Sequence, residues 1–215
     1  MGYYNNIMKD VINMNKPPIS LNTLIIRLTI LLVTVLCYSC ENHRINREIK
    51  KIYGTKIDLP NDLLAKIQDK DTIIKVQDDE FVTLIIWYDS LQCASCNVDY
   101  IEQWNGVFKY SEDSVKGFRP IIIFTPSKEN LLKLELSLKT TDFKYTVYID
   151  YNYSFVNRNP QLSKCKSQNV YLLNKEHEIV LVGNPCYNIQ MRQLYKKTIK
   201  ELIANKGVLP IETKQ

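Results

Sequence analysis

Histidine is scarce in this 215-residue chain, which contains only His43 and His177. A histidine-based catalytic triad or a metal site with several histidine ligands needs such residues in number, so the sequence argues against both classes. The basic residues are scattered, and the net charge is only +5, so the basic patch of a nucleic-acid-binding protein is also missing. Internal repeats and low-complexity segments are absent. The 45% apolar composition is sufficient for the core of an ordinary globular domain.

The N-terminal region lacks an apolar run of membrane-spanning length. Residues 28–36, directly after Arg27, form an apolar run. This run has the length of a signal-peptide core and is too short to cross a bilayer. Ser39 lies directly before Cys40, so the segment resembles a bacterial lipoprotein signal, with Cys40 as the lipidated N-terminus after cleavage. The alternative is an uncleaved anchor that embeds residues 23–38. In both cases we expect an exported body held at the membrane of the bacterial cell envelope, facing the periplasm or the cell surface, where disulfides persist.

Cysteine, in contrast, is present in a chemically meaningful pattern. Cys93 and Cys96 form a C-x-x-C pair between an apolar run at residues 81–88 and an amphipathic segment at 95–110. The run predicts a buried strand and the segment predicts a helix. Amide groups and the positive dipole end at the start of a helix favour the thiolate of the first cysteine, and this spacing lets the second resolve a mixed disulfide. The pattern therefore predicts thiol–disulfide exchange.

Two other roles remain open for this pair. One is a static disulfide. The other is a zinc site in which Cys93 and Cys96 are joined by Cys165 and Cys186, although the second pair lacks C-x-x-C spacing.

The remaining segments predict an α/β protein. We expect strands at residues 72–76, 81–88, 119–124, 145–149, 170–173 and 179–182. We expect helices at residues 61–68, 95–110, 128–139 and 189–204, and a loop with a short helical piece at 150–166. The side chains expected to face inward from the last helix are Ile189, Leu194, Ile199, Leu202 and Ile203.

This order resembles the thioredoxin-like superfamily, in particular the membrane-tethered TlpA/ResA-type thiol–disulfide oxidoreductases. The resemblance rests on the C-x-x-C after the strand at 81–88, on the hairpin sequence VYLLNKEHEIVLVG and on the closing helix. It implies a central mixed β-sheet flanked by helices, with Cys93 as the exposed attacking cysteine and Cys96 as the buried resolving one. It implies no cofactor and no metal, and it implies protein thiols or disulfides as substrates together with an upstream redox partner.

The resemblance covers roughly residues 72–203, and together with the N-terminal signal pattern it divides the chain into four parts. They are a signal peptide or anchor at 1–40, a tether and extension at 41–70, a thioredoxin-like domain at 71–206 and a tail at 207–215.

Two positions differ from the family pattern. Relatives usually carry a cis-proline just before the penultimate strand, where this chain reads Lys166-Ser-Gln-Asn-Val170, and Gln92 replaces an aromatic residue that often precedes the first cysteine. These differences favour a specialised partner over general reductase activity. They also favour an alternative function, in which the chain is a tethered binding or assembly module and its cysteines are structural. Peroxide reduction is disfavoured because no threonine-proline pair precedes Cys93. Asp89 either accepts a proton from Cys96 or caps the loop.

Cys165 and Cys186 form the second pair. If the hairpin turns at Lys175-Glu176, facing residues have numbers that add to 351, as do the numbers of these two cysteines. Opposed antiparallel positions bring Cα atoms to about 4.5 Å, which a disulfide tolerates. We therefore predict a structural disulfide; two unpaired thiols, or exchange between Cys165 and Cys93, are the alternatives.

Overall fold

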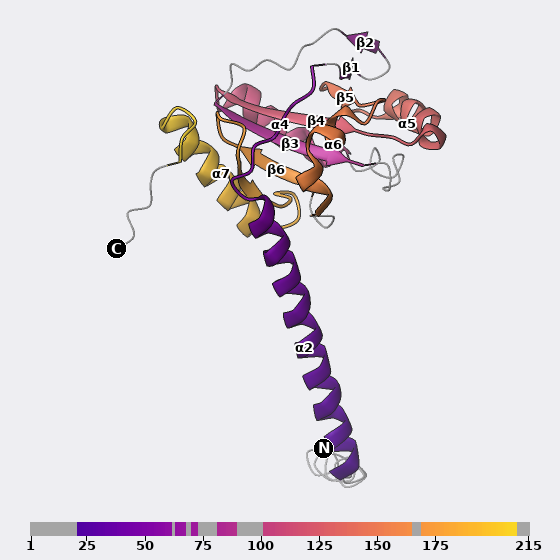
Figure 1. Cartoon of the computed structure of the whole chain (residues 1–215), viewed down its shortest axis with the longest axis vertical. Helices are drawn as coiled ribbons and strands as arrows, with labels where there is room; N and C mark the ends of the chain where they lie inside the picture. Colours follow the sequence, from indigo (N-terminus) through magenta and orange to yellow (C-terminus); the bar gives the residue numbers. More distant parts are fainter. Residues whose placement is uncertain are drawn as a thin grey trace, which may run out of the picture. The chain divides into compact units, whose positions relative to one another are not determined.

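The computed structural model describes residues 21–61, 63–67, 70–72, 81–89, 101–164 and 169–209. It divides the chain into two units, residues 1–46 and 47–215. In the first unit the described residues belong to helix α2 (Leu21–Ile52), whose last turns extend into the second unit (Figure 1). Its described leucine and isoleucine side chains between residues 21 and 32 are 48–72% exposed. Within the described part of the chain, no helix is long and apolar enough to cross a membrane.

The second unit is built on a seven-stranded sheet in the order β2-β1-β5-β4-β3-β6-β7. Strands β3, β4 and β5 run parallel, β6 is antiparallel to β3, and β7 is antiparallel to β6. The bounds are β1 Leu64–Ile67, β2 Lys70–Thr72, β3 Val82–Tyr88, β4 Phe118–Phe124, β5 Val147–Ile149, β6 Val170–Leu173 and β7 Ile179–Val182. Every residue of β3 is buried, as its β-branched and aromatic sequence predicts for a strand covered on both faces.

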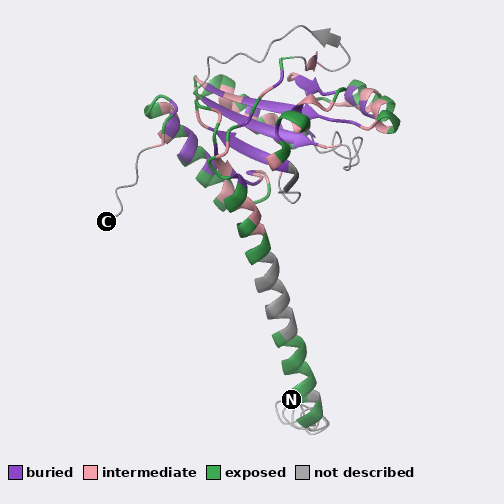
Figure 2. Cartoon of the chain, in the orientation of Figure 1, coloured by how far each residue is buried: buried purple, intermediate pink, exposed green. Residues whose placement is uncertain are grey.

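Helices cover both faces of this sheet. Their bounds are η1 Ile101–Trp104, α4 Asn105–Asp113, α5 Lys128–Thr140, α6 Ser154–Arg158, η2 Pro160–Lys164 and α7 Ile189–Ala204. The crossovers from β3 to β4 and from β4 to β5 have the same preferred hand, so α4 and α5 cover one face, and α7 joins them in the same core cluster. The other cluster contains residues of α6, η2 and the segment after α2. Figure 2 shows the buried strands between helices whose outer sides are exposed.

The strand order is that of a thioredoxin-like fold. A parallel β3-α4-β4 unit is followed by the antiparallel hairpin of β6 and β7 and by α7, with β4, β3, β6 and β7 adjacent in that order. The predicted fold class, a mixed sheet flanked by helices, is therefore confirmed. Strands β6 and β7 and helix α7 have the predicted bounds.

The N-terminal part of the second unit differs from the expectation. Residues 61–68 were predicted as a helix, but Leu64–Ile67 form β1, which pairs with β2 and β5. A segment this short carries no decisive periodicity, and its free backbone groups are satisfied by the edge of β5. Residues assigned to a tether contribute Ile52, Ile57 and Ala65 to the core, each at most 1% exposed. The strand predicted at 72–76 lies mostly outside the described residues, and β2 ends at Thr72.

Two of the five side chains predicted to face inward from α7 do not, while Ile199 and Leu202 are buried as predicted. Ile189 and Leu194 are 64% and 44% exposed. The buried residues are Tyr195, Thr198, Ile199 and Leu202. These follow the three- and four-residue spacing of a single helical stripe, which tyrosine and threonine share with the aliphatic residues.

A buried amide holds the segment after α2 against the end of α6. Asn159 is fully buried, and its Nδ2 donates to the Asp58 carbonyl at 2.8 Å and to the Phe155 carbonyl at 2.7 Å. Its Oδ1 accepts from the Asp58 backbone amide at 2.8 Å. One side chain thus satisfies both backbone groups of a residue 101 positions away.

Replacing Asn159 with alanine is expected to lower the free energy of unfolding by about 2–3 kcal/mol, because the backbone groups of Asp58 and the Phe155 carbonyl lose a fully buried partner. Urea unfolding followed by tryptophan fluorescence measures the change. Asn157→Ala in the exposed part of α6 is the matched control. Equal effects of the two substitutions would contradict the role given to Asn159.

Candidate functional site

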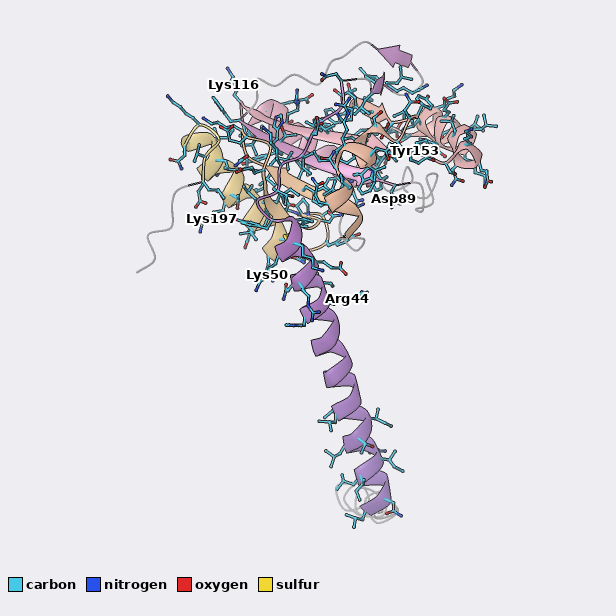
Figure 3. All side chains as sticks on the ribbon, viewed as in Figure 1. Arg44, Lys50, Asp89, Lys116, Tyr153 and Lys197 are labelled. Carbon is cyan, nitrogen blue, oxygen red and sulfur yellow. The ribbon has the colours of Figure 1, made fainter. Side chains whose placement is uncertain are left out.

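The carboxyl ends of the parallel strands meet at one edge of the sheet. The Thr125 amide donates to the Tyr88 carbonyl at 2.9 Å, and the Asp150 amide donates to the Phe124 carbonyl at 2.8 Å, so the residues after β3, β4 and β5 stay side by side. Figure 3 labels Asp89, the first residue after β3, at this edge. We call this the carboxyl edge. It is where the chain leaves β3 on its way to η1 and α4.

The start of β6 and the end of β7 lie at the same edge. Asn169, just before β6, accepts the Trp87 amide at 2.8 Å, and Gly183, just after β7, donates to the Val170 carbonyl at 3.0 Å. Connections containing all four body cysteines therefore begin or end at the carboxyl edge: residues 90–100, 165–168 and 183–188. The topology brings the described ends of these connections to one edge, although they are far apart in the sequence.

Three of these four cysteines lie outside the described residues. Cys93, Cys96 and Cys165 are among them, so their predicted roles stay predictions. Cys40 lies within helix α2, but its side chain is outside the described part as well. Asp89 is half-buried, and its predicted role toward Cys96 also stays a prediction. No group of three or more metal-ligating side chains occurs among the described residues.

Cys186 is described and half-buried, and it has no disulfide partner among the described residues. Its Sγ donates to the carbonyl of Gln103 in η1 at 3.6 Å, and its amide donates to Asn184 Oδ1 at 2.7 Å. Burial raises the pKa of the Cys186 thiol, against an opposing effect of Arg192. The thiol is therefore protonated at neutral pH and is a poor nucleophile there.

The hairpin register differs from the prediction on which the second disulfide rested. The structure pairs Leu172 with Leu181 and Tyr171 with Val182, so facing numbers add to 353 instead of 351. One extra residue enters because His177 takes a positive φ of 63° after the turn, and another enters at an irregularity between Leu172 and Leu173. The register argument for pairing Cys165 with Cys186 is therefore wrong. The pairing itself is not tested, because Cys165 is outside the described residues.

A buried tyrosine at the end of β3 is a feature that the sequence analysis missed. The Tyr88 ring stacks on Phe124 with centroids 5.0 Å apart, and Trp104 Nε1 donates to the Tyr88 hydroxyl at 3.0 Å. Burial raises the pKa of Tyr88 to about 12, against opposing hydrogen bonds from Trp104 and Gln103. This bond fixes η1 to the strand that precedes the C-x-x-C. The signal available in the sequence was a tyrosine at the end of a strand that is apolar except for Thr83.

The opposite face of β3 is fixed in a similar way. Trp87 Nε1 donates to Thr125 Oγ1 at 3.0 Å, and both residues are buried. The two aromatic residues that end β3 thus each belong to a buried hydrogen bond, one on each face of the sheet. The last residues before the C-x-x-C connection are held firmly in place.

An open groove adjoins this edge between α4 and α7. It has a volume of about 510 Å³, with Leu84, Phe118 and Ile199 among the apolar residues that line it. Cys186 and Gln103 line it as well. Among the described residues no peptide bond is cis, and the approach to β6 lies largely outside them.

Replacing Tyr88 with phenylalanine is expected to change stability at alkaline pH. The unfolded chain loses this phenolic proton near its ordinary pKa of about 10, while the folded chain keeps it until about 12. Stability from this group is therefore complete below pH 10 and is lost between pH 10 and 12, by about 2–3 kcal/mol. The variant should be less stable at pH 8, because Trp104 Nε1 lacks its acceptor, and should show a smaller alkaline loss.

Urea unfolding at pH 8, 10 and 11.5 measures this difference. The matched control is Tyr187→Phe, since Tyr187 is 79% exposed. If Tyr88→Phe and wild type lose stability in parallel above pH 10, the assignment to Tyr88 is wrong.

The chain matches no family model and no curated protein. Among solved structures it is similar to an uncharacterised thioredoxin-like protein from Porphyromonas gingivalis, with 17% identity, 70% of this chain and 95% of that chain covered, and a TM-score of 0.41. A Chlorobium tepidum protein assigned as the thiol:disulfide interchange protein DsbE has 17% identity, coverages of 70% and 97%, and a TM-score of 0.43. Peroxiredoxin Q of Xanthomonas campestris has 11% identity, coverages of 70% and 97%, and a TM-score of 0.40. These identities and scores are low, so the thioredoxin-like assignment rests on the strand order of the chain itself.

Proposed function

We propose that this chain is a thiol–disulfide oxidoreductase that acts on protein thiols or disulfides through Cys93 and Cys96. The observation that carries the proposal is the position of the C-x-x-C in the fold. It falls in the connection from Tyr88, at the end of the central strand β3, to η1 and α4, which pack on that same strand. A strand that opens onto a helix through C-x-x-C is the local arrangement that thiol exchange requires.

The proposed reaction has two steps. The Cys93 thiolate attacks one sulfur of a substrate disulfide, forming a mixed disulfide and releasing the other substrate sulfur as a thiolate, which takes a proton. Cys96, after losing its proton, attacks the sulfur of Cys93 and releases the second substrate thiol. The substrate gains two electrons and the chain is left with a Cys93–Cys96 disulfide. A dithiol partner restores the reduced pair by the same exchange in reverse.

The described residues serve this chemistry by position. The bond between Trp104 and Tyr88 holds the end of η1 against the end of β3, so the C-x-x-C connection lies between two anchored elements. Cys186 contacts the backbone of Gln103 on the same side, with its thiol protonated at neutral pH. It therefore does not compete as nucleophile.

We further propose that the body is exported and tethered by its N-terminal segment, with residues 1–40 as signal or anchor and Cys40 as the lipidated residue. Support comes from the apolar side chains of α2 between residues 21 and 32, which are exposed in the structure. Apolar side chains exposed in this number favour burial in lipid or removal with a signal peptide.

Replacing Cys93 with serine should abolish catalysed reduction of insulin by dithiothreitol, since the attacking sulfur is lost. Cys96→Ser should instead accumulate a mixed disulfide with a substrate protein, because the resolving thiol is missing. Cys186→Ser is the matched control. It should still reduce insulin and should not accumulate a mixed disulfide. Turbidity of reduced insulin and non-reducing gels provide the readouts.

A redox-buffer titration with alkylation and mass spectrometry adds a quantitative criterion. A reduction potential of the Cys93/Cys96 pair between about −270 and −200 mV fits an exchange enzyme. A potential below about −300 mV, together with no insulin reduction, would overturn the proposal. That result would favour the alternative module with structural cysteines. The lack of a proline between Lys166 and Val170 also favours this module.

Replacing Cys40 with alanine in the full-length chain expressed in a bacterium should abolish lipidation. The lipidated protein should then disappear from the membrane fraction, and the chain should be found either in the soluble fraction or as an uncleaved precursor. Incorporation of labelled palmitate should disappear at the same time. Cys37→Ala is the matched control. Unchanged membrane association of a cleaved, unlipidated protein would overturn the role of Cys40.

A further inference from the structure

The groove between α4 and α7 is formed by one face of each helix. From η1 and α4 come residues at helical spacing, including Gln103, Val107 and Tyr110, and from α7 come Arg192 and Lys196 with the floor residue Ile199. Its apolar floor continues into Leu84 of β3 and Phe118 of β4. An apolar floor with a few polar groups at the rim is the usual composition of a binding site.

The rim carries an excess of positive charge. Lys109, Arg192 and Lys196 line the groove against a single carboxylate, Asp113. Within the described part of the chain, none of these three cationic side chains forms an ion pair with a carboxylate. Lys196 Nζ lies 5.5 Å from the centroid of the Tyr110 ring. The charges are therefore available to an anionic ligand.

Two further features suit an occupant that lies along the groove. The Tyr110 hydroxyl is buried and has no hydrogen-bond partner among the described residues. Gly106 leaves room in the wall, since a Cβ built there meets no atom within 4 Å. The nine residues of α4 extend about 13 Å, which is the length of about four residues of an extended chain.

We propose that this groove binds an extended acidic segment of a partner polypeptide. The carboxylates of the segment pair with Arg192 and Lys196, and an apolar side chain packs against Val107, above the buried residues Leu84 and Phe118. Because Cys186 and Gln103 line the end of the groove nearest the carboxyl edge, a segment bound there lies beside the edge from which the proposed redox connection starts. The identification of the partner as a redox substrate rests on the proposed function. The docking itself does not.

The test uses a fluorescein-labelled peptide without cysteine that alternates glutamate with leucine, and the full-length protein in detergent. Fluorescence anisotropy should show binding that weakens as salt is added, since the rim charges are exposed. Arg192→Glu and Lys196→Glu should each weaken binding by about tenfold or more, because a charge-assisted contact is replaced by repulsion. Gly106→Leu should also weaken it by filling the groove, at a helical position where leucine is favourable.

The matched control is Lys197→Glu, which makes the same charge change on the same helix outside the groove (Figure 3). Lys197 forms an exposed ion pair with Glu201 at 3.8 Å, whose loss costs little. Binding should change by less than about twofold. A peptide with lysine in place of glutamate should not bind.

The docking proposal fails if the glutamate peptide does not bind, if the lysine peptide binds equally well, or if Lys197→Glu weakens binding as much as Lys196→Glu. A Cys93→Ser, Cys96→Ser double variant should bind the peptide as wild type does. Measured on the wild-type protein, the two proposals fail separately: failed insulin reduction with intact peptide binding overturns the redox function alone. Intact insulin reduction without peptide binding overturns the docking site alone.

Discussion

The arrangement depends on one strand that is buried on both faces. β3 lies between β4 and β6, and all seven of its residues are buried. Alternate residues enter two different core clusters, with Leu84 and Ile86 on one side and Ile85 and Trp87 on the other. A strand in this position has no freedom to shift register, because a shift by one residue would exchange the two faces. Its end at Tyr88 is therefore fixed, and the C-x-x-C connection starts from a fixed point.

Buried hydrogen bonds fix the end of β3 in addition to its apolar packing. Trp104 and Tyr88 on one face, and Trp87 and Thr125 on the other, each share a buried hydrogen bond. Buried donors need acceptors, so these bonds add directional constraint where apolar packing alone would permit sliding. Thiol exchange requires sulfur atoms held at bonding distance, and a rigid base for their connection serves that requirement.

The corrections to the sequence-based predictions have a common origin. β1 was predicted as a helix, the hairpin was given a register two residues short, and Leu194 was placed inward, although it is 44% exposed. Each of these features depends on a partner remote in sequence or on a single backbone angle. β1 depends on the free edge of β5, the hairpin register on the positive φ of His177, and the inner face of α7 on its packing against the sheet. Composition and periodicity carry little information about such choices.

The sequence by itself determined the thioredoxin-like class, the central strand, the closing hairpin and helix, and the position of Cys93 and Cys96 after the strand. These features follow from local patterns: runs of β-branched residues, helical spacing and the C-x-x-C motif. Tertiary structure alone decided that the Tyr88 hydroxyl accepts from Trp104, that Cys186 lies against Gln103, and that a cationic groove separates α4 from α7. These contacts join residues distant in the chain. Only the packing of the helices on the sheet brings them together.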